Sequence, residues 1–203
     1  MQNEMWKIEN AYFEQGVQLI CGVDEAGRGP LAGPVCAAAV ILPPNYEIPG
    51  LNDSKKLTDK KRRELFPIIK EHAIAYGIGF ADEKEIDEIN ILQATFLAMQ
   101  RAIDMLPIKP DLALIDGNRE KDFGIPVKTV VHGDSLSANI AAASVLAKVT
   151  RDDLMVEAAD QYPQYGFEIH KGYGTKVHYA AIAQHGLCPI HRKTFLKKFY
   201  GEK

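Results

Sequence analysis

Apolar residues gather in five short runs along this chain, and patterns with helical spacing lie between or after them. The runs have the length and aliphatic content of β-strands, and they cover residues 17–23, 35–42, 73–80, 112–115 and 127–131. The first two runs are separated by a glycine-rich break and resemble a hairpin. Because strands and helices alternate, the pattern predicts an α/β fold.

Longer segments with apolar residues at helical spacing predict the helices. They are residues 58–70, with Thr58 as the N-cap, 83–106, 135–159 and 176–185. Small residues between Ala141 and Ala147 would let the third of these helices lie close to a neighbouring element. Between Tyr162 and Gly174 the composition is that of a loop, and a basic tail helix is expected after Pro189.

Length and composition place the chain among folded globular proteins. Its 203 residues fit one domain, or a domain with a small lobe, and 46% hydrophobic with 25% charged residues is ordinary globular usage. A formal net charge of -3 argues against a generically basic DNA-coating protein, although basic side chains collect beyond residue 163. Disordered and fibrous classes are therefore not indicated.

The three cysteines and the hydropathy pattern bear on the compartment. Cys21, Cys36 and Cys188 show no paired spacing, which suits a reducing environment better than a disulfide framework. No apolar stretch approaches the ~20 residues of a membrane span, and none near the N-terminus has the form of a signal peptide. We therefore expect a cytoplasmic protein without a membrane partner.

The first predicted strand leads directly into two adjacent acids. Asp24 and Glu25 precede a turn in which Gly27 and Gly29 flank Arg28. A buried carboxylate without a partner costs several kcal/mol, so acids at this position need a cation, a metal or solvent. The alternative to a metal site is a solvated strand end in which Asp24 caps the turn.

Strand geometry puts a condition on the pair Asp24 and Glu25. Neighbouring side chains of a regular strand point to opposite faces, so both carboxylates cannot face one site. Either only one of them is a direct ligand, or the strand breaks at Ala26-Gly27. Such a break would let Glu25 turn inward or let its backbone carbonyl bind Mg²⁺ or Mn²⁺.

Two further acids lie where they can join this group. Asp116 ends the buried run 112–115, and strand-end acids on neighbouring strands converge at one edge of an α/β sheet. Asp134 precedes the helix 135–159, where its alternative role is that of an N-cap, just as Asp116-Gly117 could be a plain turn. Asp152 lies 18 residues beyond Asp134, roughly 27 Å along a helix, and is therefore excluded.

Several of these motifs together resemble bacterial ribonuclease HII. They are residues 23–30, Asp53-Ser54-Lys55-Lys56-Leu57, residues 114–118, 133–135, 142–152 and 172–175, in the family's order over residues 20–195. The resemblance implies a ribonuclease H-like mixed five-stranded sheet flanked by helices, with a small C-terminal helical lobe. Residues 17–160 would form the catalytic domain, and residues 161–203 would complete the substrate-binding face.

The same resemblance implies a function and a set of site residues. Asp24, Glu25, Asp116 and Asp134 would bind two divalent ions, Mn²⁺ or Mg²⁺. A monomeric enzyme would cleave RNA in RNA-DNA hybrids, and single ribonucleotides in duplex DNA, leaving 3'-hydroxyl and 5'-phosphate ends. Substrate contacts would come from Gly27, Arg28 and Gly29 around the 2'-hydroxyl, from Tyr173 at the RNA-to-DNA junction, and from Lys55 and Lys56 at phosphates. Further phosphate contacts are expected from Lys148, Lys171, Lys176, Arg192 and Lys193.

Other interpretations fit the residues less well. Gly27-Arg28-Gly29 with Gly33 lacks the spacing and the following helix of a dinucleotide fingerprint. His185, Cys188 and His191 imitate a zinc motif, but a fourth ligand is missing. The remaining alternatives are another nuclease or recombinase of the same fold, or a nucleic-acid-binding module whose acids only cap turns. For Tyr173, the alternative is an ordinary core or turn aromatic.

Overall fold

A five-stranded sheet forms the centre of the computed structural model, which describes residues 4–197 and 199–201. Its strands are β1 Ile20–Ala26, β2 Val35–Ile41, β3 Ala75–Ala81, β4 Leu112–Asp116 and β5 Val127–Val130. They lie in the order β3-β2-β1-β4-β5. β1 pairs antiparallel with β2 and parallel with β4, so the sheet is mixed, as the family resemblance implies.

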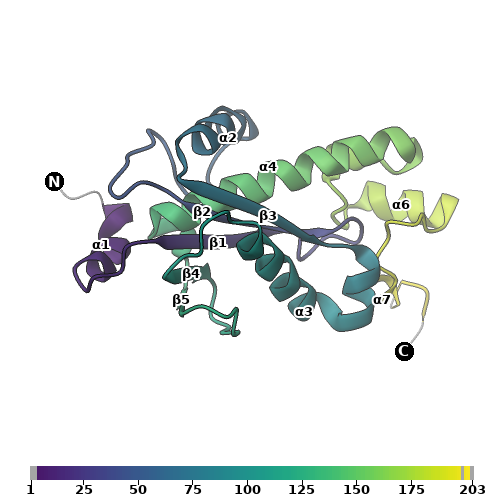
Figure 1. Ribbon diagram of the computed structural model, residues 1–203. Coiled ribbons are helices and arrows are strands. Elements are labelled where there is room, and N and C mark those ends of the chain that lie inside the picture. The colour runs from purple at the N-terminus through teal and green to yellow at the C-terminus, as the bar shows by residue number, and fades with distance from the viewer. Residues whose placement is uncertain (1–3, 198, 202–203) are drawn as a thin grey trace.

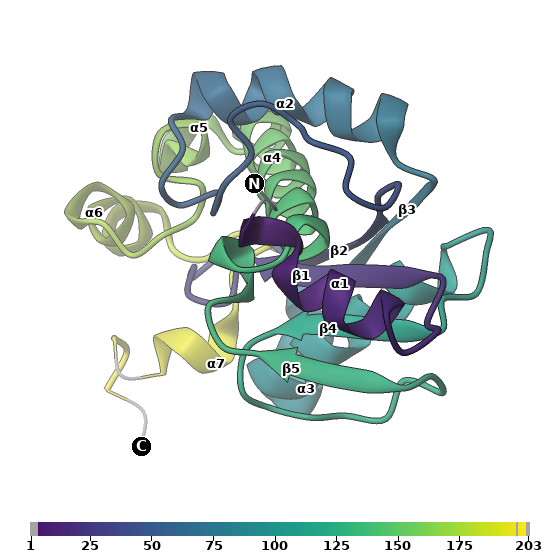
Figure 2. The same ribbon diagram turned by 90° about the vertical axis from the view of Figure 1, so that its left-hand side faces the viewer.

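Helices cover both faces of the sheet. The helical elements are η1 Glu4–Trp6, α1 Lys7–Phe13, α2 Asp59–His72, α3 Glu83–Asp104, η2 Gly133–Ser135, α4 Ala138–Gln161, η3 Pro163–Tyr165, α5 Phe167–His170, α6 Lys176–His185 and α7 Lys193–Leu196. The two long helices α3 and α4 lie on opposite sides of the sheet (Figures 1 and 2). Among the described residues, we find no helix with the length and hydropathy required to cross a membrane.

Alternation along the strands divides the core between the two long helices. Val23 and Ala37 pack with Phe96 and Met99 of α3 on one face. Gly22 faces α4 so closely that a Cβ atom there would lie 2.1 Å from a backbone carbon of α4. Even-numbered residues of β1 therefore point to the α4 face, and odd-numbered residues point to the α3 face.

Three of the predicted elements need correction, two in where they begin and one in its continuity. The first strand covers Ile20–Ala26 rather than 17–23, because the Asp111 carboxylate accepts hydrogen bonds from the backbone N–H groups of residues 18 and 19. The helix expected over 83–106 is interrupted at Asn90, whose φ is 66° and whose side chain caps the second part. The helix expected from 135 begins at Ala138, with Ser137 as its N-cap.

The N-terminal segment belongs to the fold, which the sequence left open. Trp6 is buried among core residues, and Glu9 of α1 is fully buried against the start of α4. Glu9 Oε1 accepts hydrogen bonds from the Ser137 hydroxyl at 2.6 Å and from the Asn139 backbone N–H at 3.2 Å. α1 therefore fixes the start of α4 and the turn that precedes it.

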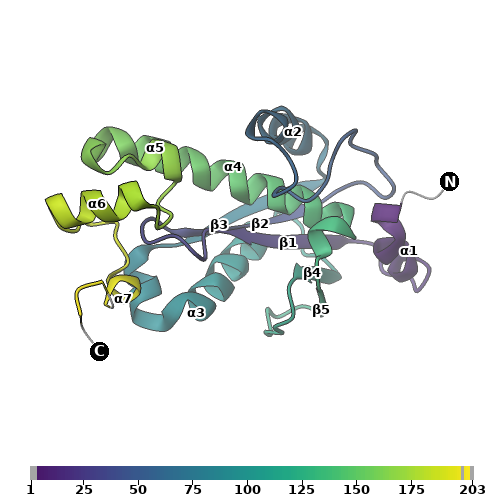
Figure 3. The same ribbon diagram turned by 180° about the vertical axis from the view of Figure 1, so that it is seen from behind.

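The C-terminal segment gathers at the end of the sheet where β1 leads into its loop, away from α1 (Figure 3). Together with the loop after β1 and the end of α4, it forms a small core that includes Leu31, Met155, Phe167 and Ile182. The loop expected between 162 and 174 contains η3 and α5, and the basic tail helix is only the four-residue α7. Lys198 and Lys203 of the predicted tail lie outside the described residues.

Candidate active site

Three carboxylates from separate parts of the chain meet at one edge of the sheet. Asp24, Asp116 and Asp134 each offer an oxygen within 4.8 Å of the other two. Asp24 and Asp116 come together because Val23 pairs with Ile115 in the parallel strands β1 and β4, so the next residue of each strand lies beside the other. Asp134 reaches them from η2, the turn before α4.

The local hydrogen bonds and burial decide whether these three carboxylates, here called the acid group, form a shared site or only cap turns and helices. Asp134 does not cap α4, since Ser137 does, so the capping interpretation of Asp134 is wrong. Asp116 Oδ1 accepts the Gly133 backbone N–H at 2.7 Å, which ties the turn carrying Asp134 to β4. Asp24 is 3% exposed, and this excludes a solvated strand end.

The electrostatics of this group favour a bound cation. Burial, and then the neighbouring carboxylates Glu25 and Asp116, raise the pKa of Asp24 well above its ordinary value. Burial and the nearby Asp116 likewise raise the pKa of Asp134. Buried carboxylates that repel one another are hard oxygen donors of the type that Mg²⁺ and Mn²⁺ prefer. The donor set therefore fits divalent cations.

Glu25 lies on the other face of the sheet from this group. β1 stays regular through Ala26, with Glu25 opposite Ala37, and the chain turns only at Gly27, where φ is 98°. The Glu25 side chain lines a pocket together with α3 residues and Asp116, and the Arg28 guanidinium lies 3.4 Å away. The geometry thus favours the alternative in which only one of the adjacent acids faces the group, and the metal role of Glu25 stays a prediction.

The predicted lysines lie beside the acids. Lys55 Nζ is 3.5 Å from Asp134 Oδ2, and Lys56 Nζ donates to the Ser135 hydroxyl at 2.9 Å. Partial burial would lower the pKa of Lys55, but the attraction of Asp24, Asp134 and Asp116 outweighs burial and raises it. The segment of Lys55 and Lys56 therefore partly neutralises the acid group from the solvent side.

The glycine turn and Tyr173 face each other although they are far apart in sequence. A Cβ atom on Gly29 would lie 3.7 Å from the Tyr173 ring, in ordinary contact, and both residues are exposed. Tyr173 is 44% exposed, which excludes a core role for its ring. Lys148 Nζ lies 6.0 Å from the centre of that ring.

Two buried arginines shape the turn, and sequence patterns do not reveal either role. Arg192 is fully buried and donates to the backbone carbonyls of Gly27, Arg28, Pro30 and Gly33. The expected phosphate contact of Arg192 is therefore wrong, because its guanidinium is used inside the fold. Arg151 of α4 is 1% exposed and donates to further carbonyls of the same turn and of residue 171. Nothing in the sequence around a single arginine indicates that its side chain is buried. Arg192 becomes buried only because the C-terminal segment packs on the turn after β1.

Asp152, excluded from the site by distance, has a structural role. Its carboxylate is buried and lies 2.8 Å from Lys148 Nζ, one helical turn earlier on α4. It does not belong to the carboxylate group found among the described residues. Asp152 therefore holds Lys148 on α4 and lies outside the site, as its distance from Asp134 along the chain predicted.

The mixed sheet, the helices on both faces and the converging acids define the ribonuclease H-like fold class. The family model described as Ribonuclease HII matches residues 21–198. Two similar proteins named Ribonuclease HII come from Endomicrobium trichonymphae and Vibrio parahaemolyticus, and they are 56% and 58% identical to this chain. Each alignment covers 96% of this chain, and it covers 93% of the first protein and 94% of the second. The chain therefore belongs to the ribonuclease HII family of endoribonucleases.

Solved structures agree with this fold. The ribonuclease H2 of Pyrococcus horikoshii OT3 superposes with a TM-score of 0.72 at 28% identity, covering 87% of this chain and 93% of that one. A Bst-RNase HIII structure in complex with Mn²⁺ has a TM-score of 0.67 at 19% identity, covering 87% of this chain and 65% of that one, and supports the fold alone.

Proposed function

We propose that this protein hydrolyses the RNA strand of RNA-DNA hybrids and also cuts at single ribonucleotides embedded in duplex DNA. The observation that supports this most directly is the convergence of Asp24, Asp116 and Asp134 at the end of β1, which leads into a turn with Gly27 buried and Gly29 exposed. Family membership supports the same activity. The products would carry 3'-hydroxyl and 5'-phosphate ends.

Asp24, Asp116 and Asp134 would hold the divalent ions, with Glu25 approaching from the opposite face beside Asp116. When bound, a pair of such ions activates a water and stabilises the leaving oxygen of a phosphodiester. The chain itself keeps the carboxylates close and buried, and Lys55 supplies a positive charge at the rim for the phosphate backbone. Mn²⁺ and Mg²⁺ both suit these oxygen donors.

The glycine turn is suited to detect a 2'-hydroxyl through its backbone. The carbonyls of Gly27 and Arg28 accept hydrogen bonds from Arg192, and no described peptide bond is cis. In a trans peptide, the N–H points away from the carbonyl, so the N–H groups of Arg28 and Gly29 point away from Arg192. These donors can bind a 2'-hydroxyl and the neighbouring phosphate. DNA has the phosphate but lacks the hydroxyl, so only a ribonucleotide offers both at this position.

Tyr173 and the C-terminal segment would complete the substrate surface. Because its ring lies across from Gly29, Tyr173 can contact the nucleotide that follows the ribonucleotide, by stacking or by hydrogen bonding. Residues 161–203 would thereby act as one face of the substrate groove and residues 17–160 as the catalytic domain. We further expect a monomer. We also expect a cytoplasmic location, which the three buried free cysteines support.

The test compares fluorescently labelled duplexes that contain one ribonucleotide, a full RNA strand or only DNA. We expect cleavage of the first two in Mn²⁺ or Mg²⁺ and none after chelation, with a downstream fragment whose mobility changes when a phosphatase removes its 5'-phosphate. Asp24→Asn and Asp116→Asn should abolish turnover but keep binding in fluorescence anisotropy, and the exposed Glu157→Gln is the matched control. Cleavage of the all-DNA duplex would refute the ribonuclease assignment, and binding without cleavage would favour a nucleic-acid-binding module.

A further inference from the structure

Two buried histidines lie in line beneath Tyr173, outside the acid site. His178 of α6 is fully buried and His191 is 2% exposed. His178 Nδ1 lies 2.9 Å from the Tyr173 backbone carbonyl, and His178 Nε2 lies 3.0 Å from His191 Nε2. At the far end, His191 Nδ1 accepts the Cys188 backbone N–H at 2.9 Å. The contacts form a continuous chain from the C-terminal loop to Tyr173.

A single arrangement of protons satisfies this chain. Burial lowers the pKa of His178, and it lowers the pKa of His191 to about 4, so both rings are neutral near pH 7. A carbonyl only accepts, so His178 must carry its proton on Nδ1, and its Nε2 is then a bare acceptor. His191 must therefore carry its proton on Nε2, which leaves its Nδ1 to accept from the Cys188 backbone N–H and from the Cys188 thiol, whose sulfur lies 3.0 Å away. The Cys188 carbonyl lies 3.3 Å from the same nitrogen, but it already accepts the His191 backbone N–H at 3.1 Å.

The loop that carries Tyr173 needs such a support. Lys171 and Gly172 have φ of 52° and 83°, and a left-handed conformation is unfavourable at the lysine. A third buried histidine, His170, accepts the Gly172 backbone N–H on Nδ1 at 3.2 Å, and its ring stacks on His178 at 4.5 Å. Two further backbone hydrogen bonds hold Tyr173: its carbonyl also accepts the Thr175 N–H at 2.8 Å, and its own N–H donates to the His170 carbonyl at 2.9 Å. Its ring stays exposed toward Gly29.

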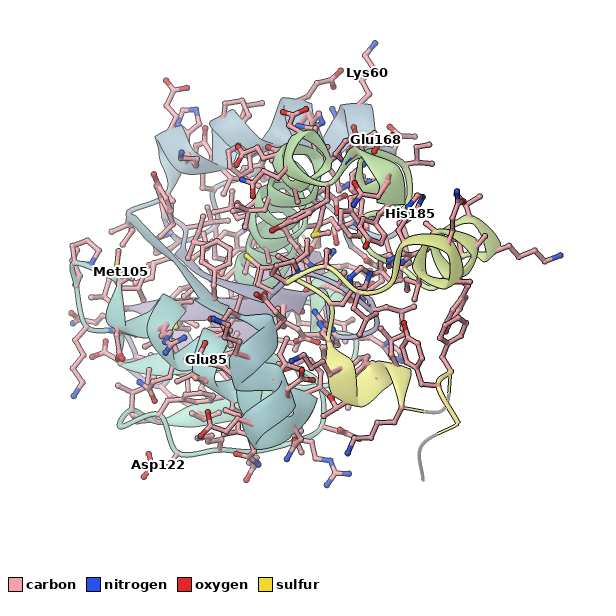
Figure 4. The ribbon with its side chains drawn as sticks, turned by 90° about the vertical axis from the view of Figure 1, so that its right-hand side faces the viewer. Lys60, Glu85, Met105, Asp122, Glu168 and His185 are labelled. Carbon is pink, nitrogen blue, oxygen red and sulfur yellow. The ribbon has the colours of Figure 1, made fainter. Side chains whose placement is uncertain are left out.

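We infer that His178 and His191 are positioning residues, which hold Tyr173 across from Gly29 by fixing its carbonyl through one defined pair of tautomers. The inference rests on the proposed role of Tyr173 at the substrate. It does not require a metal, because the nitrogens of His191 already bind partners on opposite sides. His185, Cys188 and His191, which the sequence pattern did not support as a zinc site, do not converge, since His185 is exposed beside the end of α6 (Figure 4).

The first test reads the tautomers directly. In ¹⁵N-histidine NMR spectra of the whole protein near neutral pH, we expect His178 to show the Nδ1–H pattern and His191 the Nε2–H pattern. The signals are assigned by their loss in His178→Asn and in His191→Gln. A charged His178, or an Nε2–H tautomer at that residue, would overturn the inference. This measurement does not depend on catalysis, so it stands even if the proposed activity fails.

The second test separates positioning from plain structural support. His178→Leu removes the donor, and we expect its kcat for a single-ribonucleotide duplex to fall about tenfold to a hundredfold, as for an ångström-scale misplacement. His178→Asn keeps an amide donor near the place of Nδ1 and should recover most of that loss. The exposed His185→Asn is the matched control on the same helix and should leave the rate unchanged.

A double variant completes the design. If His178 acts through Tyr173, adding His178→Leu to Tyr173→Ala should cost nothing further in kcat, because the residue that is positioned has already been removed. Fully additive losses, or an unrescued His178→Asn that unfolds like the wild type, would overturn the positioning role. Absence of cleavage by the wild-type protein in the same assay would instead refute the proposed function.

Discussion

Removing one charge from the acid group should stabilise the metal-free fold even though it abolishes turnover. Asp24→Asn keeps the size of the side chain and the oxygen that accepts the Glu25 backbone N–H at 2.7 Å. Burial and neighbouring carboxylates raise the pKa of Asp24, which means that the fold disfavours its ionised form. The metal-free protein therefore holds this charge at a cost in stability.

The separation of the carboxylates sets the size of the effect. At the upper limit of 4.8 Å, two unit charges in an effective dielectric constant of ~20 repel by about 3.5 kcal/mol. Asp24 has two such neighbours, but the attraction of Lys55 and partial protonation offset much of the repulsion. We expect Asp24→Asn to gain about 1–3 kcal/mol in the free energy of unfolding without metal, a fraction of the Coulomb sum.

Urea unfolding near neutral pH, followed by circular dichroism with chelator and with Mn²⁺, measures this change. Mn²⁺ should stabilise the wild type, because a ligand that binds only the folded state shifts the equilibrium, and it should stabilise Asp24→Asn much less. Asp152→Asn is the control, since it breaks the ion pair with Lys148 and should lose stability while keeping the Mn²⁺ response. A less stable metal-free Asp24→Asn with an intact Mn²⁺ response would refute the reasoning.

Three further predictions follow from the turn and its supports. Gly27→Ala should destabilise the protein, since φ at this position is 98° and an atom of the buried Arg151 side chain lies 2.0 Å from the new Cβ. Gly29→Ala should keep the urea midpoint of the wild type. It should nevertheless cut single ribonucleotides about tenfold more slowly, because the new methyl group fills space in front of the Tyr173 ring. Equal urea midpoints for the two variants would contradict this difference. Arg192→Met should lose about 3–5 kcal/mol in urea unfolding, because buried carbonyls would lose their donor, and a loss under about 1 kcal/mol would exclude that role. His191 is neutral in the fold, with its pKa lowered from 6.5 to about 4, so the unfolded chain binds the extra proton and stability falls as pH drops through that window. The slope reaches about 1.4 kcal/mol per pH unit for one such group, and His191→Gln should lose that slope relative to the wild type.

Local patterns along the chain were sufficient to predict most of the secondary structure and two of the acids that meet, Asp24 and Asp116, whereas Asp134 came from the family resemblance. Strand runs ending in Asp24 and Asp116 predict a shared sheet edge, because neighbouring strands bring their ends together. Thr58 as an N-cap is also confirmed, since a cap depends only on the residues of the first helical turn. These features depend on neighbours in sequence, so the sequence contains them directly.

Other features were decided by contacts between distant segments. The break at Asn90 is an exception, because its capping signal is local, but the regular apolar spacing on both sides hides it. The burial of Arg192 and of the His178–His191 pair exists only once the C-terminal segment docks on the turn after β1.

For Glu25, too, the sequence predicts the residue at the site, but only the tertiary structure decides which way its side chain points. From the sequence alone, either face of the sheet was open to its side chain, since both a broken and a regular strand were compatible with the glycines that follow. Pairing with β2 keeps β1 regular through Ala26 and directs Glu25 to the α3 face, while Asp24 points to Asp116 and Asp134. Alternation in a strand is a local rule, but where the strand ends depends on its partners, and these belong to the tertiary structure.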